Sequence, residues 1–223
     1  MKKIFTVIII ILILLLCLTW WETPRREVCG EVDRSYSVVL DAGHGGTDGG
    51  ALGITTGCKE ADINLAITLK TKALLESAQV HVVLTRDNEG SLCGEPYSKQ
   101  RDMQLRARLI NDAAPDIVVS VHMNSYPNAS VKGAQVFYYP DSEQGEALAG
   151  KIQESFVRHA DKENKRVIKE GDFFLLRTYA GPSALVECGF LTCPEEERLL
   201  LEQEYQDIVA YSIFDGIMRY LMT

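Results

Sequence analysis

The sequence lacks the features that mark nucleic-acid-binding and repeat proteins. Its 223 residues carry a net charge of −8, and no cluster of lysine or arginine stands out that could neutralise phosphates. Nucleic acid is therefore not a predicted partner. There is also no internal repeat and no low-complexity tract. A chain of this length is predicted to hold one domain and an appendage.

Paired cysteine motifs are also lacking. The six cysteines show no CxxC spacing, and Cys17 falls in an apolar N-terminal segment, which leaves five, an odd number. An exported protein can form disulfides, but this spacing defines no framework. Separate small thiols are the simpler interpretation, and the disulfide pattern stays open.

The N-terminus carries the clearest signal for location. Met1-Lys2-Lys3 precedes an apolar run from Ile4 to Trp21 that only two threonines interrupt. The run has the length of a short membrane-spanning helix, roughly 17–25 residues, and its final tryptophan pair suits a membrane interface. We predict an uncleaved membrane anchor at 1–21, with a cleaved signal peptide as the alternative, followed by a tether at 22–34 and an exported domain at 35–223.

Apolar runs typical of strands alternate with helical patterns along this domain. The predicted strands are Tyr36–Asp41, Val80–Thr85, Asp116–His122, Ala134–Tyr139 and Ser183–Glu187. The predicted helices are 60–79, Lys99–Ala113, Ser142–Arg158, a short helix or turn at Phe173–Thr178, and one long helix from Pro194 to about Leu221. This order predicts an α/β fold, a three-layer sandwich in which helices flank a mainly parallel sheet.

Chemically useful side chains follow or end three of these strands. The first strand runs into the glycine-rich stretch VVLDAGHGGTDGGA, residues 38–51, which presents His44; the other two end at His122 and Glu187. Because ligand sites in such sheets lie beyond the carboxyl ends of the strands, we expect these side chains to converge. With Glu60 at the start of the next helix, two imidazoles and a carboxylate form a known ligand set of catalytic zinc, and a second carboxylate can take a proton from water.

Each of these residues has a simpler structural interpretation. No HExxH motif fixes the ligands, so either histidine could be a strand-end residue with local hydrogen bonds. Glu60 could be an acid favourably placed at a helix N-terminus. Glu187 could be paired with an arginine such as Arg177. A phosphate-binding loop is disfavoured because the lysine-serine/threonine ending of a P-loop is missing.

Four ordered motifs make the domain recognisable. LDAGHGGTDGGA, KEADINLA, VVSVHMNS and SALVECGFLTCPEEE together resemble the zinc-dependent N-acetylmuramoyl-L-alanine amidases of the Amidase_3 type, over roughly residues 38–220. The resemblance implies an α/β sandwich, Zn²⁺ as cofactor, His44, Glu60 and His122 as metal ligands, and Glu187 as the catalytic glutamate. It also suggests Asp41 and Asn124 as candidates for hydrogen bonds around the site, or for turn and strand-end roles.

The implied reaction is hydrolysis of the amide between N-acetylmuramic acid and L-alanine in peptidoglycan. A catalytic domain on an N-terminal membrane segment, without wall-binding repeats, resembles sporulation and germination amidases that act on spore cortex so that muramic lactam can form. The alternatives are a vegetative wall-turnover amidase, a zinc peptidase that cuts within the stem peptide, and an inactive peptidoglycan-binding or activator protein. The implied location is the extracytoplasmic face of the membrane, the cell wall or the cortex.

Control by an exported regulatory protein is a further expectation, with the polar loop Asp87–Lys99 as one candidate place for it. Two positions depart from the family pattern, Met123 and Cys193, which bears on the shape of the substrate groove. Cys58 and Cys188 lie close in sequence to the two glutamates, so a thiolate ligand is an alternative. Neighbouring residues on a strand point to opposite faces, so Glu187 and Cys188 should not both face the site.

Overall fold

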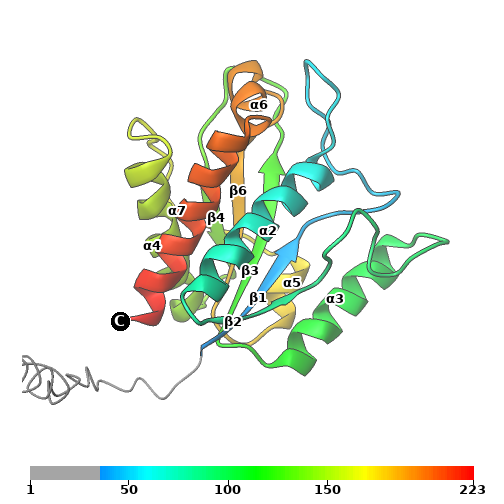
Figure 1. Cartoon of the computed structure of the whole chain (residues 1–223), viewed down its shortest axis with the longest axis vertical. Helices are drawn as coiled ribbons and strands as arrows, with labels where there is room; N and C mark the ends of the chain where they lie inside the picture. The colour runs from blue at the N-terminus through cyan, green and yellow to red at the C-terminus, as the bar shows by residue number, and fades with distance from the viewer. Residues whose placement is uncertain (1–35) are drawn as a thin grey trace, which may run out of the picture. The chain divides into compact units, whose positions relative to one another are not determined.

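The computed structural model describes residues 36–223. The predicted anchor at 1–21 and tether at 22–34 lie outside the described residues. The domain is built on a six-stranded sheet with the order β2-β1-β3-β6-β4-β5 (Figure 1). The strands are β1 (Ser37–Ala42), β2 (His81–Leu84), β3 (Ile117–Asn124), β4 (Gln135–Tyr138), β5 (Lys169–Glu170) and β6 (Ser183–Phe190).

The sheet is mainly parallel, as predicted. β1 pairs in parallel with β2 and β3, β3 with β6, and β4 with β5, whereas β4 runs antiparallel to β6. The three central strands, β1, β3 and β6, are nearly continuous apolar runs that are buried along their length. This burial pattern is the one expected of parallel strands covered by helices on both faces.

Helices cover the two faces of the sheet and complete the three predicted layers (Figure 1). One face carries α2 (Glu60–Ser77), α4 (Glu143–His159) and α7 (Gln203–Leu221), and the larger apolar core lies beneath them. The other face carries α3 (Lys99–Ala113) and the short α5 (Phe174–Thr178) over a smaller core. No helix within 36–223 is both long enough and apolar enough to cross a membrane.

The predicted long C-terminal helix is wrong as a single element. It is two helices, α6 (Pro194–Leu200) and α7, because the backbone at Glu202 is extended. The side-chain amide of Gln206 donates to the carbonyl of Leu200, which a continuing helix would satisfy from its own backbone. Two strand ends also differ from prediction, because β3 and β6 run past His122 and Glu187. The two-residue β5 was not among the predicted strands.

Candidate active site

The sheet order brings the three predicted strand ends together. β1, β3 and β6 are neighbours, and in their register His122 lies opposite Glu187 while Ala42, two residues before His44, lies opposite Val121. The backbone N–H of Gly43 still bonds to the sheet, donating to the carbonyl of Val121 at 3.1 Å. The predicted convergence is therefore confirmed, although His122 and Glu187 lie within their strands instead of at the ends.

Two imidazoles and a carboxylate meet at this edge. The Nε2 atom of His44 lies 3.2 Å from Oε1 of Glu60, and Nδ1 of His122 lies 2.9 Å from the same oxygen. One donor atom from each of the three residues lies within 4.8 Å of the others. We call these three residues together with Glu187 the histidine cluster. Three nitrogen and oxygen donors that face one another are chemically suited to holding a metal ion.

The backbone of the glycine-rich stretch makes this approach possible. A Cβ atom at Gly43 would lie 2.2 Å from the ring of His122, and one at Gly50 would lie 2.5 Å from Oε2 of Glu60. His44 itself has a φ of 63°, an uncommon backbone conformation for a residue with a side chain. Glycine at these two positions therefore lets the backbone lie against His122 and Glu60.

Glu60 is fixed at the first turn of α2 by hydrogen bonds to both of its oxygens. Its Oε2 accepts from the backbone N–H of Ala51, and its Oε1 accepts from the backbone N–H of Met123. Burial by itself raises the pKa of Glu60, but the two imidazoles outweigh that effect and hold it well below its usual range. Burial likewise lowers the pKa of His44, yet contacts with Glu60 and Asp48 raise it overall. Glu60 is therefore a fixed anion facing both histidines.

Glu187 is the carboxyl group of the cluster that has an oxygen without a hydrogen-bond partner within residues 36–223. Its Oε2 atom is buried and has no hydrogen-bond partner among the described residues. Burial raises the pKa of Glu187 to about 7; the negative charge of Glu60 adds to this increase and the two histidines oppose it. Leaving such an oxygen unpaired costs free energy, so it is the kind of group that proteins retain for chemistry.

All four side chains line one cavity of about 530 Å³. It lies at the carboxyl ends of β1, β3 and β6, on the face of the sheet covered by α3 and α5. Polar groups of the histidine cluster occupy one side, and apolar side chains from α3, α5 and β6 line the other. The apolar wall consists of Met103, Phe173, Phe174, Leu175, Leu176 and Leu185.

Several alternatives raised by the sequence are decided by these contacts. Arg177 pairs with Asp172 at 2.6 Å and not with Glu187. Cys188 is buried in the core on the opposite face of β6, as strand alternation predicts. The thiol of Cys58 approaches the carboxylate of Glu197 at 3.9 Å. The candidate metal cluster within residues 36–223 contains no cysteine.

The two positions that depart from the family pattern have separate locations. Met123 is buried, lines the cavity, and therefore shapes the groove, as expected. Cys193 is buried at the N-terminus of α6 and is not part of the cavity lining. Asn124 lines the cavity, and its side-chain oxygen accepts a hydrogen bond from the backbone N–H of Ser125 at 2.8 Å.

Asp41, which the sequence left between two roles, belongs to a buried ion network beside the cavity. Its Oδ1 accepts from Arg106 at 2.7 Å and from Thr85 at 2.6 Å, and its Oδ2 accepts from Ser120. Arg106 also donates to Asp102 at 2.7 Å. Although burial raises the pKa of Asp41, Arg106 and the two hydroxyls lower it to about 2. We call these five residues the Asp41 network.

The network supports the loop that carries the first histidine. Arg106 donates to the backbone carbonyl of Ala42 at 2.7 Å and to that of His44 at 2.5 Å. A second buried arginine, Arg86, donates to the carbonyls of Ala42, Gly43 and Ala61. Both arginines therefore hold the backbone at the end of β1 through its carbonyl groups.

Sequence reasoning missed two residues that contact the site. Asp48 lies 3.0 Å from Nδ1 of His44, and the hydroxyl of Tyr97 donates to Asp48 at 2.9 Å. A carboxylate four residues after a candidate ligand was a usable signal for Asp48. Nothing in the local sequence pointed to Tyr97, because its contact spans a separation of 49 residues.

The geometry defines an α/β protein with a candidate metal site at the carboxyl ends of its central parallel strands. The family model for N-acetylmuramoyl-L-alanine amidase matches residues 38–219. The chain belongs to this family. Comparison with solved structures confirms the predicted fold class, since solved amidases superimpose on most of the chain.

Three relatives illustrate the likeness. The chain is 35% identical to the germination-specific N-acetylmuramoyl-L-alanine amidase of Bacillus subtilis, over 82% of this chain and 78% of the relative. The CwlD amidase of Clostridioides difficile, solved in complex with the GerS lipoprotein, is 39% identical, with a TM-score of 0.81 over 84% of this chain and 98% of that one. The catalytic domain of the amidase CwlV from Bacillus (Paenibacillus) polymyxa is 30% identical, with a TM-score of 0.74 over 84% and 98%.

Proposed function

We propose that this protein hydrolyses the amide between N-acetylmuramic acid and L-alanine in peptidoglycan, in the maturation or germination of spore cortex. Family membership supports the reaction, and the relative from Bacillus subtilis supports the biological role. The observation that carries the proposal is the convergence of His44, Glu60, His122 and Glu187 in one cavity at the sheet edge. A purely structural fold would have no need of this grouping.

We propose Zn²⁺ as the cofactor, held by His44, Glu60 and His122. The fit rests on the donor set, two imidazole nitrogens and a carboxylate oxygen within 4.8 Å of one another. Three protein ligands of these types are typical of catalytic zinc, which keeps a fourth position open. When bound, zinc supplies Lewis-acid polarisation of a carbonyl and makes water more acidic.

Glu187 is the proposed general base and acid. It lines the cavity, and its Oε2 atom has no hydrogen-bond partner among the described residues, so this oxygen is free to accept a proton from the attacking water and then deliver it to the departing amine of L-alanine. The proton balance closes within one turnover, because the carboxylate is regenerated when the amine leaves. The apolar wall formed by α3 and α5 limits the water around this carboxylate and so keeps its pKa high.

Digestion of purified cortex peptidoglycan by the full-length protein, with and without a chelator, tests the proposal. We expect chelator-sensitive release of peptides that begin with a free L-alanine, and glycan strands with intact muramic acid, by mass spectrometry. New termini within the stem peptide would indicate a peptidase instead. Binding without products would indicate an inactive binding protein, and a preference for vegetative wall would move the role to wall turnover.

We propose that residues 1–21 deliver the domain across the membrane and, if uncleaved, anchor it there, with 22–34 as the tether. The apolar run and the peptidoglycan substrate both support an extracytoplasmic location, because the substrate lies outside the membrane. The mass of the mature protein distinguishes the two forms. Retention of Met1–Trp21 in the membrane fraction indicates an anchor, and a shortened secreted chain indicates a signal peptide.

A regulatory partner is the last part of the proposal. The amidase from Clostridioides difficile was solved with the GerS lipoprotein. By analogy, we propose that an exported lipoprotein binds this chain. Full activity and full zinc affinity of the purified protein without any partner would contradict a requirement for one.

A further inference from the structure

A carboxylate outside the proposed ligand set holds the far side of a ligand imidazole. While Nε2 of His44 faces Glu60, its other nitrogen, Nδ1, lies 3.0 Å from Oδ1 of Asp48. Asp48 is itself fixed, because the backbone N–H of Gly50 donates to its Oδ1 at 3.1 Å and Tyr97 donates to its Oδ2 at 2.9 Å. A carboxylate oxygen therefore lies beside each nitrogen of the imidazole.

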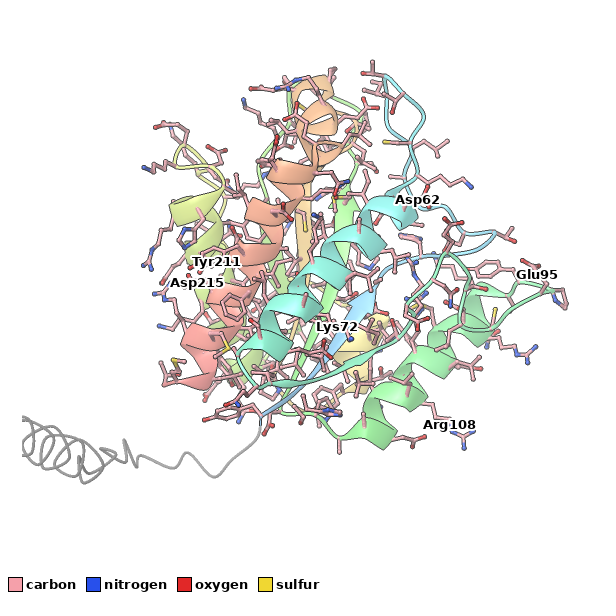
Figure 2. All side chains as sticks on the ribbon, viewed as in Figure 1. Asp62, Lys72, Glu95, Arg108, Tyr211 and Asp215 are labelled. Carbon is pink, nitrogen blue, oxygen red and sulfur yellow. The ribbon has the colours of Figure 1, made fainter. Side chains whose placement is uncertain are left out.

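Tyr97 belongs to the long polar segment at 87–98, which we call the 87–98 loop. This loop lies against the glycine-rich stretch at several points. The backbone N–H of Gly46 donates to the carbonyl of Glu89 at 2.6 Å, and the hydroxyl of Thr47 donates to Glu95 at 2.7 Å. Figure 2 shows Glu95 at the outer end of this loop, away from the sheet.

The two segments are thus joined by a backbone hydrogen bond, by the contact between Thr47 and Glu95, and by the contact between Tyr97 and Asp48. The loop itself is tied to α3, because the backbone N–H of Cys93 donates to Asp102 of the Asp41 network at 2.9 Å. A route of direct contacts therefore runs from α3 through the 87–98 loop to the imidazole of His44.

We infer that Asp48 and Tyr97 are positioning residues that set the affinity of the site for zinc. Asp48 acts on His44 directly, and Tyr97, carried by the 87–98 loop, acts through Asp48. The inference rests on the proposed function, because it takes His44 as a ligand of zinc. The 87–98 loop, which we expect to be a place of control, would then act by changing the affinity for zinc.

The chemical reason lies in the two nitrogens of one ring. A neutral imidazole has one N–H donor and one lone pair, and the partner of the donor decides which nitrogen carries the lone pair. A carboxylate oxygen 3.0 Å from Nδ1 favours a proton on that nitrogen, which leaves the lone pair on Nε2, the nitrogen that faces Glu60. It also restrains rotation of the ring, and such partners of ligand histidines commonly alter metal affinity by about 10–100-fold.

The zinc dissociation constant of the full-length protein in detergent tests this inference, measured by competition with a chromophoric chelator. We expect Asp48→Ala to weaken zinc binding about 10–100-fold. Asp48→Asn, which keeps an acceptor oxygen, should recover part of that loss. Tyr97→Phe should weaken binding about threefold to tenfold, as expected for the loss of one ordinary hydrogen bond that acts on the ligand indirectly.

A matched control removes a tyrosine hydroxyl elsewhere. Tyr179 donates to the backbone carbonyl of Pro115, just before the start of β3, whereas His122 lies toward the end of that strand, so Tyr179→Phe should leave zinc affinity unchanged. Because Tyr97 acts through Asp48, adding Tyr97→Phe to Asp48→Ala should weaken binding no further. Thermal unfolding of each variant in the presence of a chelator checks that the fold is retained.

The outcomes separate this inference from the proposal beneath it. Wild-type zinc affinity in both Asp48→Ala and Tyr97→Phe overturns the inference while leaving the metal site in place. Additive losses in the double variant overturn the route through Asp48. A wild-type chain without measurable zinc affinity overturns the proposed metal site, and this inference with it.

Discussion

The Asp41 network and the histidine cluster border the same cavity, and they differ in how completely their buried polar atoms are hydrogen-bonded. In the Asp41 network, both carboxylate oxygens of Asp41 accept hydrogen bonds, and Arg106 bridges Asp41 and Asp102. In the histidine cluster, two imidazoles face one oxygen of Glu60, and Oε2 of Glu187 has no partner among the described residues.

The difference separates structural from chemical roles at one edge of a sheet. A buried ion network with its hydrogen bonds satisfied can be kept for rigidity, since removing one partner leaves an uncompensated charge. A cluster with an unpaired buried oxygen is costly to the fold and is retained when a ligand or a reaction uses it. The comparison supports the catalytic role proposed for the histidine cluster and a structural role for the Asp41 network.

The largest effect is expected for activity when Glu187→Gln removes the general base. Turnover of cortex peptidoglycan should fall by about 10²–10⁴-fold, the range that proton transfer by a positioned side chain contributes. Zinc should remain bound, because Glu187 is not among the three proposed ligands. Product release followed by mass spectrometry and metal content measured on the same sample check both statements. Retained activity would contradict the role assigned to Glu187.

Arg106→Met should produce the largest loss of stability. It leaves Asp41 as a buried anion without its cationic partner, and breaking such pairs costs about 3–5 kcal/mol. Arg108→Met on the same helix is the matched control, since its pair with Asp112 is exposed, at 3.6 Å, and surface pairs contribute about 0–1 kcal/mol. Figure 2 shows Arg108 pointing away from the domain. Equal urea midpoints for the two variants would contradict the distinction.

Glu187 and Asp41 should make the free energy of unfolding depend on pH in opposite directions. In the chelated protein, the pKa of Glu187 is raised from 4.5 to about 7, so between these values the folded chain holds a proton that the unfolded chain releases. The free energy of unfolding should therefore fall as pH rises through this window, by about 1–3 kcal/mol. The pKa of Asp41 is lowered from 3.8 to about 2, so its contribution is present above 3.8 and is lost as pH falls through about 2.

Urea unfolding at a series of pH values in the presence of a chelator measures the first of these slopes. Glu187→Gln should lack the decline between pH 4.5 and 7, whereas Glu163→Gln, at an exposed glutamate, should keep it. Parallel curves for wild type and Glu187→Gln would show that burial does not penalise this carboxylate.

The histidine cluster was predictable from sequence because each member lies beside a strong local signal. His44 follows a buried strand and precedes a glycine pair, His122 lies in an apolar run, and Glu187 interrupts one. Their convergence was expected from the rule that ligand sites form at the carboxyl ends of parallel strands, and the strand order of the structure brings them together. Local pattern and topology predicted the convergence, whereas the roles of the residues came from the resemblance to the amidases.

The Asp41 network and the helix break were not predictable in the same way. Arg106 pairs with Asp41 across 65 residues, and nothing near either residue in the sequence names its partner. The break before α7 depends on Gln206 reaching the carbonyl of Leu200, although the local pattern favours one continuous helix. Both depend on side chains that meet only after the chain has folded, as does the contact between Tyr97 and Asp48.

The smallest effects come from single hydroxyls, and their signs should differ. Ser120 donates to Asp41, so Ser120→Ala removes a hydrogen bond to a buried charge and should lower the free energy of unfolding by about 1–3 kcal/mol. The hydroxyl of Thr68, buried in α2, has no partner among the described residues, so Thr68→Val should be neutral or stabilising by about 1 kcal/mol. Urea unfolding at pH 7 measures both. Equal losses of stability would mean that the hydrogen bonding of a buried polar atom does not decide its contribution to stability. The contrast drawn between the Asp41 network and the histidine cluster would then fail.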